Sequence, residues 1–109
     1  MSDVELLGSF EEQVMLAIVR TADEAYGMAV RRELERVTGR ELTIGAVYAT
    51  LDRLEAKRLV RSVRAGVAGS SRRVFAVTRS GAEALADTRA IRDRLWKGVD
   101  LQRLLAGTS

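Results

Sequence analysis

Apolar side chains recur at the spacing of an α-helix in the first part of the chain. Ser9 with Glu12 three residues later has the pattern of a capping box, which predicts a helix beginning there. The apolar residues that follow are spaced so widely around this helix that we expect it to be covered on more than one side. These residues are Phe10, Val14, Met15, Leu16, Ala17 and Ile18.

Two further helices are predicted before residue 60. The first spans about 26–38, and Gly39 is placed to end it. The second begins at Thr43, which can cap it, and runs to about Arg58. Its buried stripe is predicted to consist of Ile44, Val47, Leu51 and Leu54. Its outward face is predicted to carry Gly45, Ala49, Asp52 and Arg53, with Tyr48 and Thr50 on the flanks.

Residues 59–65 and 72–77 alternate roughly between β-branched or aromatic residues and polar ones. The segment between them is rich in glycine and serine, so the pair reads as a β-hairpin. Strand alternation sends Arg72 and Arg73 to opposite faces, and only one of them is expected to make an intimate contact with a partner. Arg61 and Arg64 add to the positive charge of this hairpin.

A last helix is predicted to start at Thr78, with Gly81 in its first turn. Mainly apolar side chains of this helix follow a near-heptad track, and Trp96 lies beside that track. A single exposed helix attached to a small domain cannot hide this stripe alone, so it either folds back on the first helix or pairs with a second chain. The track consists of Ala84, Thr88, Ile91, Leu95, Val99 and Gln102.

Composition agrees with one small globular domain that is mainly α with a β-hairpin. The chain has 109 residues, 47% of them apolar, and a net charge of +3. Residues 1–42 hold five basic and nine acidic side chains, residues 43–80 hold eight and two, and residues 81–109 hold five and four. The positive field is therefore concentrated in the middle third, where it can attract a polyanion, although a solvated basic surface explains the charge equally well.

Several function classes are excluded or made unattractive by what the sequence lacks. It has no cysteine and no histidine, and it shows no nucleophile motif; its glycine-rich hairpin tip lacks the lysine and helix of a phosphate-binding loop. We therefore expect no catalytic site, no metal and no cofactor. No apolar run approaches the roughly 18 residues that cross a membrane, and no signal pattern opens the chain, so a cytoplasmic location without membrane contact is expected.

Three helices followed by a basic hairpin are the layout of a winged helix-turn-helix domain. In such a domain the third helix fits the major groove and the hairpin arginines reach the DNA backbone. Two other functions fit the same layout: a protein-interaction module whose hairpin meets an acidic partner, and an architectural protein that binds DNA without sequence preference.

The motifs of the chain resemble those of the PadR family of bacterial transcriptional repressors. The resemblance spans roughly residues 6–85 and rests on Tyr26-Gly27, the run TIGAVYATLDRLE at 43–55, Leu59-Val60, the run RRVFAVT at 72–78, and Gly81. It implies a DNA-binding domain at 1–78, a C-terminal dimerisation helix at 79–109 as in the short-tailed subgroup, and a homodimer on a palindromic operator. It also makes plausible a small hydrophobic effector that releases the repressor from DNA.

Three positions depart from the family pattern. Ala49 stands where proline is common, and Arg58 stands where glycine is frequent just before the Leu-Val pair. Asp52 stands where a basic or polar residue is common. A carboxylate facing DNA is repelled by phosphate unless it is paired or accepts from the amino group of a cytosine.

Two sets of site residues follow from these arguments. The predicted DNA contacts are Thr43, Gly45, Tyr48, Ala49, Thr50, Arg53, Arg64, Ser71, Arg72 and Arg73. Tyr48 either donates its hydroxyl to a phosphate or fills the edge of the core. The predicted dimer contacts are Phe10, Val14, Ile91, Leu95, Trp96 and Val99. Trp96 either packs in that interface or lines an apolar cavity for a flat effector.

Overall fold

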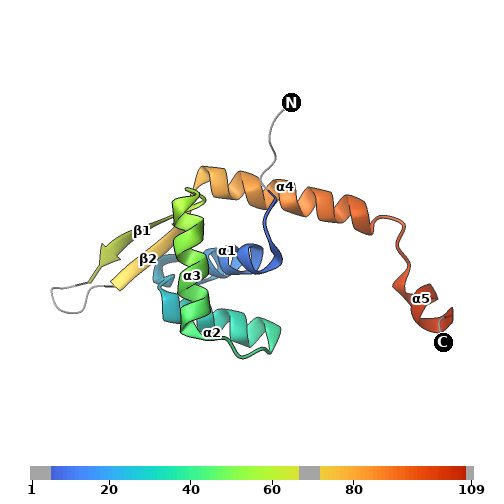
Figure 1. Cartoon of the computed structure of the whole chain (residues 1–109), viewed down its shortest axis with the longest axis horizontal. Helices are drawn as coiled ribbons and strands as arrows, with labels where there is room; N and C mark the ends of the chain where they lie inside the picture. The colour runs from blue at the N-terminus through green and yellow to red at the C-terminus, as the bar shows by residue number, and fades with distance from the viewer. Residues whose placement is uncertain (1–5, 67–71, 108–109) are drawn as a thin grey trace.

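A computed structural model describes residues 6–66 and 72–107 of the chain. The helices before the hairpin are α1 (Ser9–Thr21), the 3-10 turn η1 (Ala22–Glu24), α2 (Gly27–Thr38) and α3 (Ile44–Ala56). Strands β1 (Val60–Ala65) and β2 (Arg72–Val77) form the hairpin, and α4 (Arg79–Trp96) and α5 (Leu101–Gly107) follow it. Figure 1 shows α1, α2 and α3 packed together, with the hairpin extending from one side and α4 from the top. The predicted class, mainly α with a small hairpin in a winged helix-turn-helix arrangement, is confirmed.

One hydrophobic core joins α1, α2, α3 and the base of the hairpin. The apolar stripe predicted for α3 is buried at Val47, Leu51 and Leu54, while Ile44 packs at its edge. Removing this much apolar surface from water supplies the main driving force for folding. The largest fully buried side chains of the core are Val14, Met15, Val30, Val47, Leu51, Leu54, Val60 and Phe75.

The start of α1 differs by one residue from the predicted capping box. Gly8, and not Ser9, precedes the helix, and its N–H donates to Oε1 of Glu11 at 3.0 Å. Glu12, the residue expected to close the box, instead pairs with Arg92 of α4. Two glutamates in a row satisfy the same local pattern, and only the packing of α4 decides between them.

The ends of α2 and α3 follow the predicted caps closely. Gly39 ends α2 in the left-handed region at φ 72°, and the Thr43 hydroxyl accepts from the Ala46 N–H at 3.1 Å. The third helix ends at Ala56, two residues earlier than predicted, because Arg58 adopts a φ of +63°. Its left-handed conformation turns the chain so that the Leu59 N–H donates to the Leu54 carbonyl at 3.0 Å.

The hairpin is antiparallel and is tied to the segment before α2. Its register pairs Val60 with Val77 at the base and Ala65 with Arg72 at the outer end. The Phe75 N–H also donates to the Ala25 carbonyl at 2.8 Å, so the second strand is held on both edges. This anchoring fixes the hairpin beside α3 (Figure 1).

Thr78 caps α4 as predicted, and the first half of that helix packs on the domain. Its hydroxyl accepts from the Gly81 N–H at 3.0 Å. Ala84 is buried, and Thr88 accepts from the Leu7 N–H at 3.1 Å, so α4 folds back on the segment that leads into α1.

The prediction of one continuous helix through Gln102 is wrong. Helix α4 ends at Trp96, and Gly98 takes a φ of +81° before the short helix α5 begins at Leu101. We call residues 91–107 the C-terminal arm. The Cα radius of gyration is 16.7 Å, against about 13 Å for a compact chain of this length. The larger value reflects the arm, which projects from the domain on the side opposite the hairpin (Figure 1).

Candidate nucleic-acid interface

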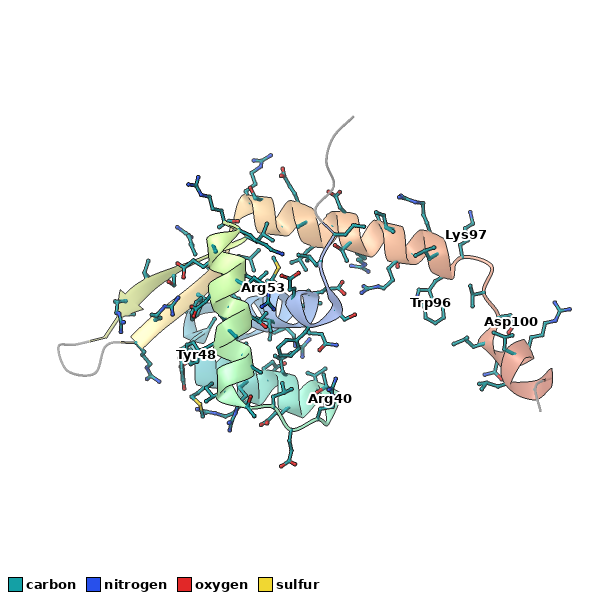
Figure 2. All side chains as sticks on the ribbon, in the orientation of Figure 1. Arg40, Tyr48, Arg53, Trp96, Lys97 and Asp100 are labelled. Carbon is teal, nitrogen blue, oxygen red and sulfur yellow. The ribbon has the colours of Figure 1, made fainter. Side chains whose placement is uncertain are left out.

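The outward face of α3 is exposed and nearly free of large side chains. Gly45, Ala49, Asp52 and Arg53 are all exposed, as the sequence predicted. A Cβ added at Gly45 would meet no atom within 4 Å, so the start of the helix is open to a partner. Figure 2 shows α3 at the front of the domain, with Tyr48 and Arg53 labelled along it. A large, flat surface can therefore approach the backbone of this helix.

Tyr48 connects this face to the start of α2. Its half-buried ring lies over Gly27, where an added Cβ would come within 2.3 Å of the ring carbon Cζ and 2.5 Å of the hydroxyl. Within the described residues its hydroxyl makes no hydrogen bond, which leaves it available to an outside acceptor. The structure thus confirms the position at the core edge, and phosphate contact remains a prediction.

Thr50 does not lie on the exposed face, contrary to its place among the predicted DNA contacts. It is 3% exposed, and its hydroxyl accepts from Nη2 of Arg53 at 3.2 Å. One helical turn separates it from Val47 and Leu54 on the two sides, so the core closes over it. Its side chain positions Arg53 instead of meeting a partner.

Arg73 of the hairpin is held by two carboxylates of α3. Its Nη1 lies 3.1 Å from Oδ1 of Asp52, and its Nη2 lies 2.7 Å from Oε1 of Glu55. Glu55 also accepts from the Ser62 hydroxyl, and this bond, with that from Arg73, outweighs burial and lowers the pKa of Glu55. The pairing accounts for a carboxylate at position 52, because Asp52 forms an ion pair with an arginine of the hairpin.

Arg72 points to the other face of the hairpin, as strand alternation predicted. Its guanidinium carbon lies 4.0 Å from the centre of the Tyr26 ring, and Arg32 lies 5.9 Å from the same centre. Sequence reasoning missed Tyr26 as a site residue, because nothing in the local pattern shows that β2 brings an arginine onto it. Guanidinium groups over a tyrosine face are attracted by the ring electrons and keep their outer N–H groups for a ligand.

Arg64 is exposed on β1, opposite Arg73 in the register. In the described part of the chain it forms no ion pair, so its charge is available to a partner. Arg61 is exposed in the same way. Ser71, the remaining predicted contact, lies outside the described residues.

Charges on and around α3 balance one another. Glu11 of α1, which is buried, lies 3.0 Å from Nζ of Lys57 and 3.5 Å from Nε of Arg53. Burial raises the pKa of Glu11, but hydrogen bonds from Lys57 and the Gly8 N–H lower it by more than burial raises it. The pKa of Glu11 is therefore below its ordinary value. Three carboxylates thus face three cations here, namely Glu11, Asp52 and Glu55 against Arg53, Lys57 and Arg73. Within the described residues, the cations of this region that form no ion pair are Arg58 after α3 and the hairpin residues Arg61, Arg64 and Arg72.

The predicted dimer contacts divide between the core and the arm. Val14 is fully buried and Phe10 packs against the core, so the expectation that Val14 faces a second chain is wrong. Leu95, Trp96 and Val99 are 73%, 51% and 46% exposed. Ile91 is half-buried where α4 leaves the domain. Figure 2 places Trp96 near the end of α4, away from the packed helices.

Neither a metal-binding cluster nor a membrane-spanning helix is found within residues 6–66 and 72–107. No group of three or more metal-ligating side chains is assembled there. No helix in those ranges has the length and apolar content needed to span a membrane.

Comparison with known proteins decides the family. The model of the transcriptional regulator PadR-like family matches residues 15–87, more than half of the chain. The chain belongs to the PadR-like family. The transcriptional regulator Rv3488 of Mycobacterium tuberculosis is 36% identical to it over 77 residues, which are 71% of each protein. A PadR-like protein is thus a DNA-binding transcription regulator and not an enzyme.

Two solved structures share the fold. A PadR-like regulator from Bacillus cereus superposes with a TM-score of 0.72 at 20% identity, covering 91% of this chain and 93% of its own. RosR of H. salinarum superposes with a TM-score of 0.69 at 26% identity, covering 95% and 90%. Because more than nine-tenths of this chain is covered, the superposition includes part of the C-terminal arm as well as α1 to α3 and the hairpin.

Proposed function

We propose that this PadR-like protein is a homodimeric repressor that binds a palindromic operator and is released from it by a small hydrophobic effector. The observation that carries the proposal is the open face of α3 lying beside a hairpin whose arginines Arg64 and Arg72 keep donors for an outside partner. Such a regulator acts where DNA is, which in a bacterium is the cytoplasm.

In this proposal the first two turns of α3 enter the major groove. Gly45 and Ala49 allow the helix backbone to come close to the base edges, and Tyr48 donates its hydroxyl to a phosphate. The N–H groups at the start of α3 that Thr43 does not satisfy are available to a second phosphate oxygen.

The hairpin supplies affinity that depends on salt. Arg64 and Arg72 contact the DNA backbone and release bound counterions, whereas Arg73 is committed to Asp52 and Glu55. Arg73 therefore links the hairpin to α3, the proposed recognition helix. Of the two neighbouring arginines, Arg72 is the one assigned to DNA.

The arm joins the two chains. Leu95 and Leu105 are 73% and 78% exposed, and Trp96 and Leu101 lie between them, so the arm presents an apolar surface with little cover from its own domain. Two-fold pairing of these arms places two copies of α3 on one side of the dimer. Half-sites about 10 bp apart, or a small multiple, follow from that symmetry.

The effector is assigned to the same arm. Trp96, half-exposed near the end of α4, would meet its symmetry mate there and offer a flat apolar wall. A ligand that binds one arrangement of the arms more tightly than another shifts the distance between the two recognition helices. Because the chain has one tryptophan, its fluorescence reports on this site alone.

Selection of bound sequences from a random duplex pool tests DNA recognition. We expect a palindromic consensus whose affinity falls steeply with salt, and Arg64→Ala with Arg72→Ala should flatten that dependence. Arg89→Ala, on the exposed face of α4, is the control for each single hairpin substitution: it removes one positive charge away from the hairpin and should leave the slope unchanged. Absence of any duplex binding at low salt would favour a protein-interaction module, and equal affinity for all duplexes would favour an architectural protein.

Sedimentation equilibrium tests the dimer. Leu95→Asp should give monomers at concentrations where the wild-type chain is a dimer. Val37→Asp, at a residue of α2 that is 57% exposed, places the same charge on another apolar surface residue and should leave the dimer intact. A monomeric wild-type chain at high concentration would contradict the assignment.

A further inference from the structure

Asp52 is the one residue with a hydrogen-bonding side chain along the central line of the exposed face of α3. Gly45, Ala49, Asp52 and Ala56 are spaced by four, three and four residues, which places them in one row, and all four are exposed. Glycine and alanine have no polar side-chain atoms. A groove floor lying along this row would therefore meet a single functional group, the Asp52 carboxylate.

The cations beside this row are directed elsewhere. Arginine and lysine are the usual readers of guanine in the major groove. Arg53, however, lies 3.5 Å from Glu11 and donates to Thr50, and Lys57 lies 3.0 Å from Glu11. Both side chains are thus engaged with α1 or with α3 itself, which leaves Asp52 as the reader with an open side.

The hairpin holds the Asp52 carboxylate without covering it. Its side chain is 61% exposed, and Arg73 donates to one of its oxygens, Oδ1, at 3.1 Å. Arg73 is itself fixed by Glu55 and by the buried ring of Phe75, whose centre lies 4.8 Å from the guanidinium carbon. Within the described residues the second oxygen, Oδ2, has no hydrogen bond. The nearby positive charge also offsets repulsion between this carboxylate and DNA phosphates.

We infer that Asp52 is a specificity residue that accepts a hydrogen bond from the amino group of a cytosine. This inference rests on the proposed entry of α3 into the major groove. Cytosine presents an amino donor there, whereas guanine and thymine present only acceptors to a hydrogen-bonding group. Adenine has an amino donor beside the acceptor N7, which repels a carboxylate. A fixed carboxylate therefore discriminates against the other three bases.

Selection from a random duplex pool with four proteins tests this inference: the wild-type chain, Asp52→Ala, Asp52→Asn and Glu55→Gln. The wild-type consensus should hold a cytosine at one position of each half-site. Asp52→Ala should lose the preference at that position alone, and Asp52→Asn should move it toward adenine, which pairs with an amide. Glu55→Gln disturbs the same arginine without touching Asp52 and should retain cytosine.

Binding to fixed duplexes gives the magnitude. Replacing that cytosine by adenine, with its pairing partner, should weaken wild-type binding about tenfold and leave the affinity of Asp52→Ala unchanged. Retention of the cytosine preference in both Asp52 variants would overturn the inference. Loss of the cytosine preference in Glu55→Gln would also overturn it, because Asp52 would then act only as a support for Arg73. A wild-type palindrome without such a cytosine removes this inference only, whereas selection of no sequence removes the proposed operator recognition as well.

Discussion

The ring of Tyr48 occupies the space that any side chain on Gly27 would need. An added Cβ at Gly27 would lie 2.3 Å from the ring carbon Cζ, 2.5 Å from the hydroxyl and 2.7 Å from Cε2. The start of α2 and the exposed helix α3 are therefore fitted together at one glycine and one tyrosine. Both residues belong to the motifs on which the family resemblance rests, and this contact gives a physical reason for the pairing.

Gly27→Ala should lower the free energy of unfolding by about 1–3 kcal/mol, the usual cost of overpacking. It should also weaken DNA binding, because the displaced tyrosine lies next to the face proposed to meet DNA. Tyr48→Ala in the same chain should restore much of the lost stability, since the two substitutions are coupled. Urea denaturation of both single variants and the double variant measures the coupling, and additive effects would show that Tyr48 moves aside freely.

Gly81→Ala should be more damaging, because the obstacle there is backbone. An added Cβ would lie 2.0 Å from the Leu59 carbonyl oxygen and 2.9 Å from side-chain atoms of Met15 and Val77. We expect a loss of about 3 kcal/mol or more in the free energy of unfolding, measured by thermal denaturation. Gly45→Ala, where an added Cβ meets nothing within 4 Å, is the matched control and should unfold at or above the wild-type temperature.

Arg58→Gly should stabilise the protein by about 1 kcal/mol, because a left-handed conformation costs an L-residue roughly that amount. Arg58 has a φ of +63° and an exposed side chain, so little packing is lost. Arg40→Gly, at an exposed residue without a positive φ, should give no such gain. The midpoint of urea denaturation compares the two, and a destabilised Arg58→Gly variant would show that its side chain contributes more than the strain costs.

Stability should decline as the pH falls from about 4.5 to about 2, in part because of Glu33. Hydrogen bonds from Arg36 and Arg20 lower the pKa of this carboxyl from 4.5 to about 2. A group with a lowered folded-state pKa stabilises the fold above its ordinary pKa and loses that contribution as it is protonated. Glu33→Gln should therefore reduce the dependence of stability on pH in this range.

The control for that titration is Glu41→Gln, at an exposed residue that forms no ion pair within the described residues. Its pH profile should match the wild-type profile. If Glu33→Gln also leaves the profile unchanged, the bridge from Arg20 of α1 to α2 contributes nothing to stability, as is common for surface ion pairs.

The local signals of the sequence predicted the elements well. Thr43, Gly39 and Thr78 cap where expected, because a cap is satisfied by atoms only a few residues away. The α3 stripe is buried for a similar reason, since helical periodicity determines which side chains share a face.

What local pattern could not supply were the contacts between distant segments. Thr50 sits on the edge of a helical face, and only the packed core shows that it is 3% exposed. From sequence alone, a carboxylate at Asp52 is unfavourable on a helix that faces DNA. The structure explains it, because the hairpin places Nη1 of Arg73 3.1 Å from Oδ1 of Asp52. The break at Gly98 interrupted a heptad track that read as continuous, because a single glycine does not reveal its φ in sequence.

The close contact of Gly81 with Leu59 fixes the start of α4, so a small rotation of the helix about this point would displace its far end. From Gly81 to Trp96 the helix rises about 22 Å, and the domain holds it at Gly81, at Thr88 and through the ion pair of Arg92 with Glu12. A tilt of about 5° at the glycine would move the tryptophan end by about 2 Å over that length. In the proposed dimer such a displacement would be repeated by symmetry, so a change too small to disturb the core would alter the spacing of the two recognition helices.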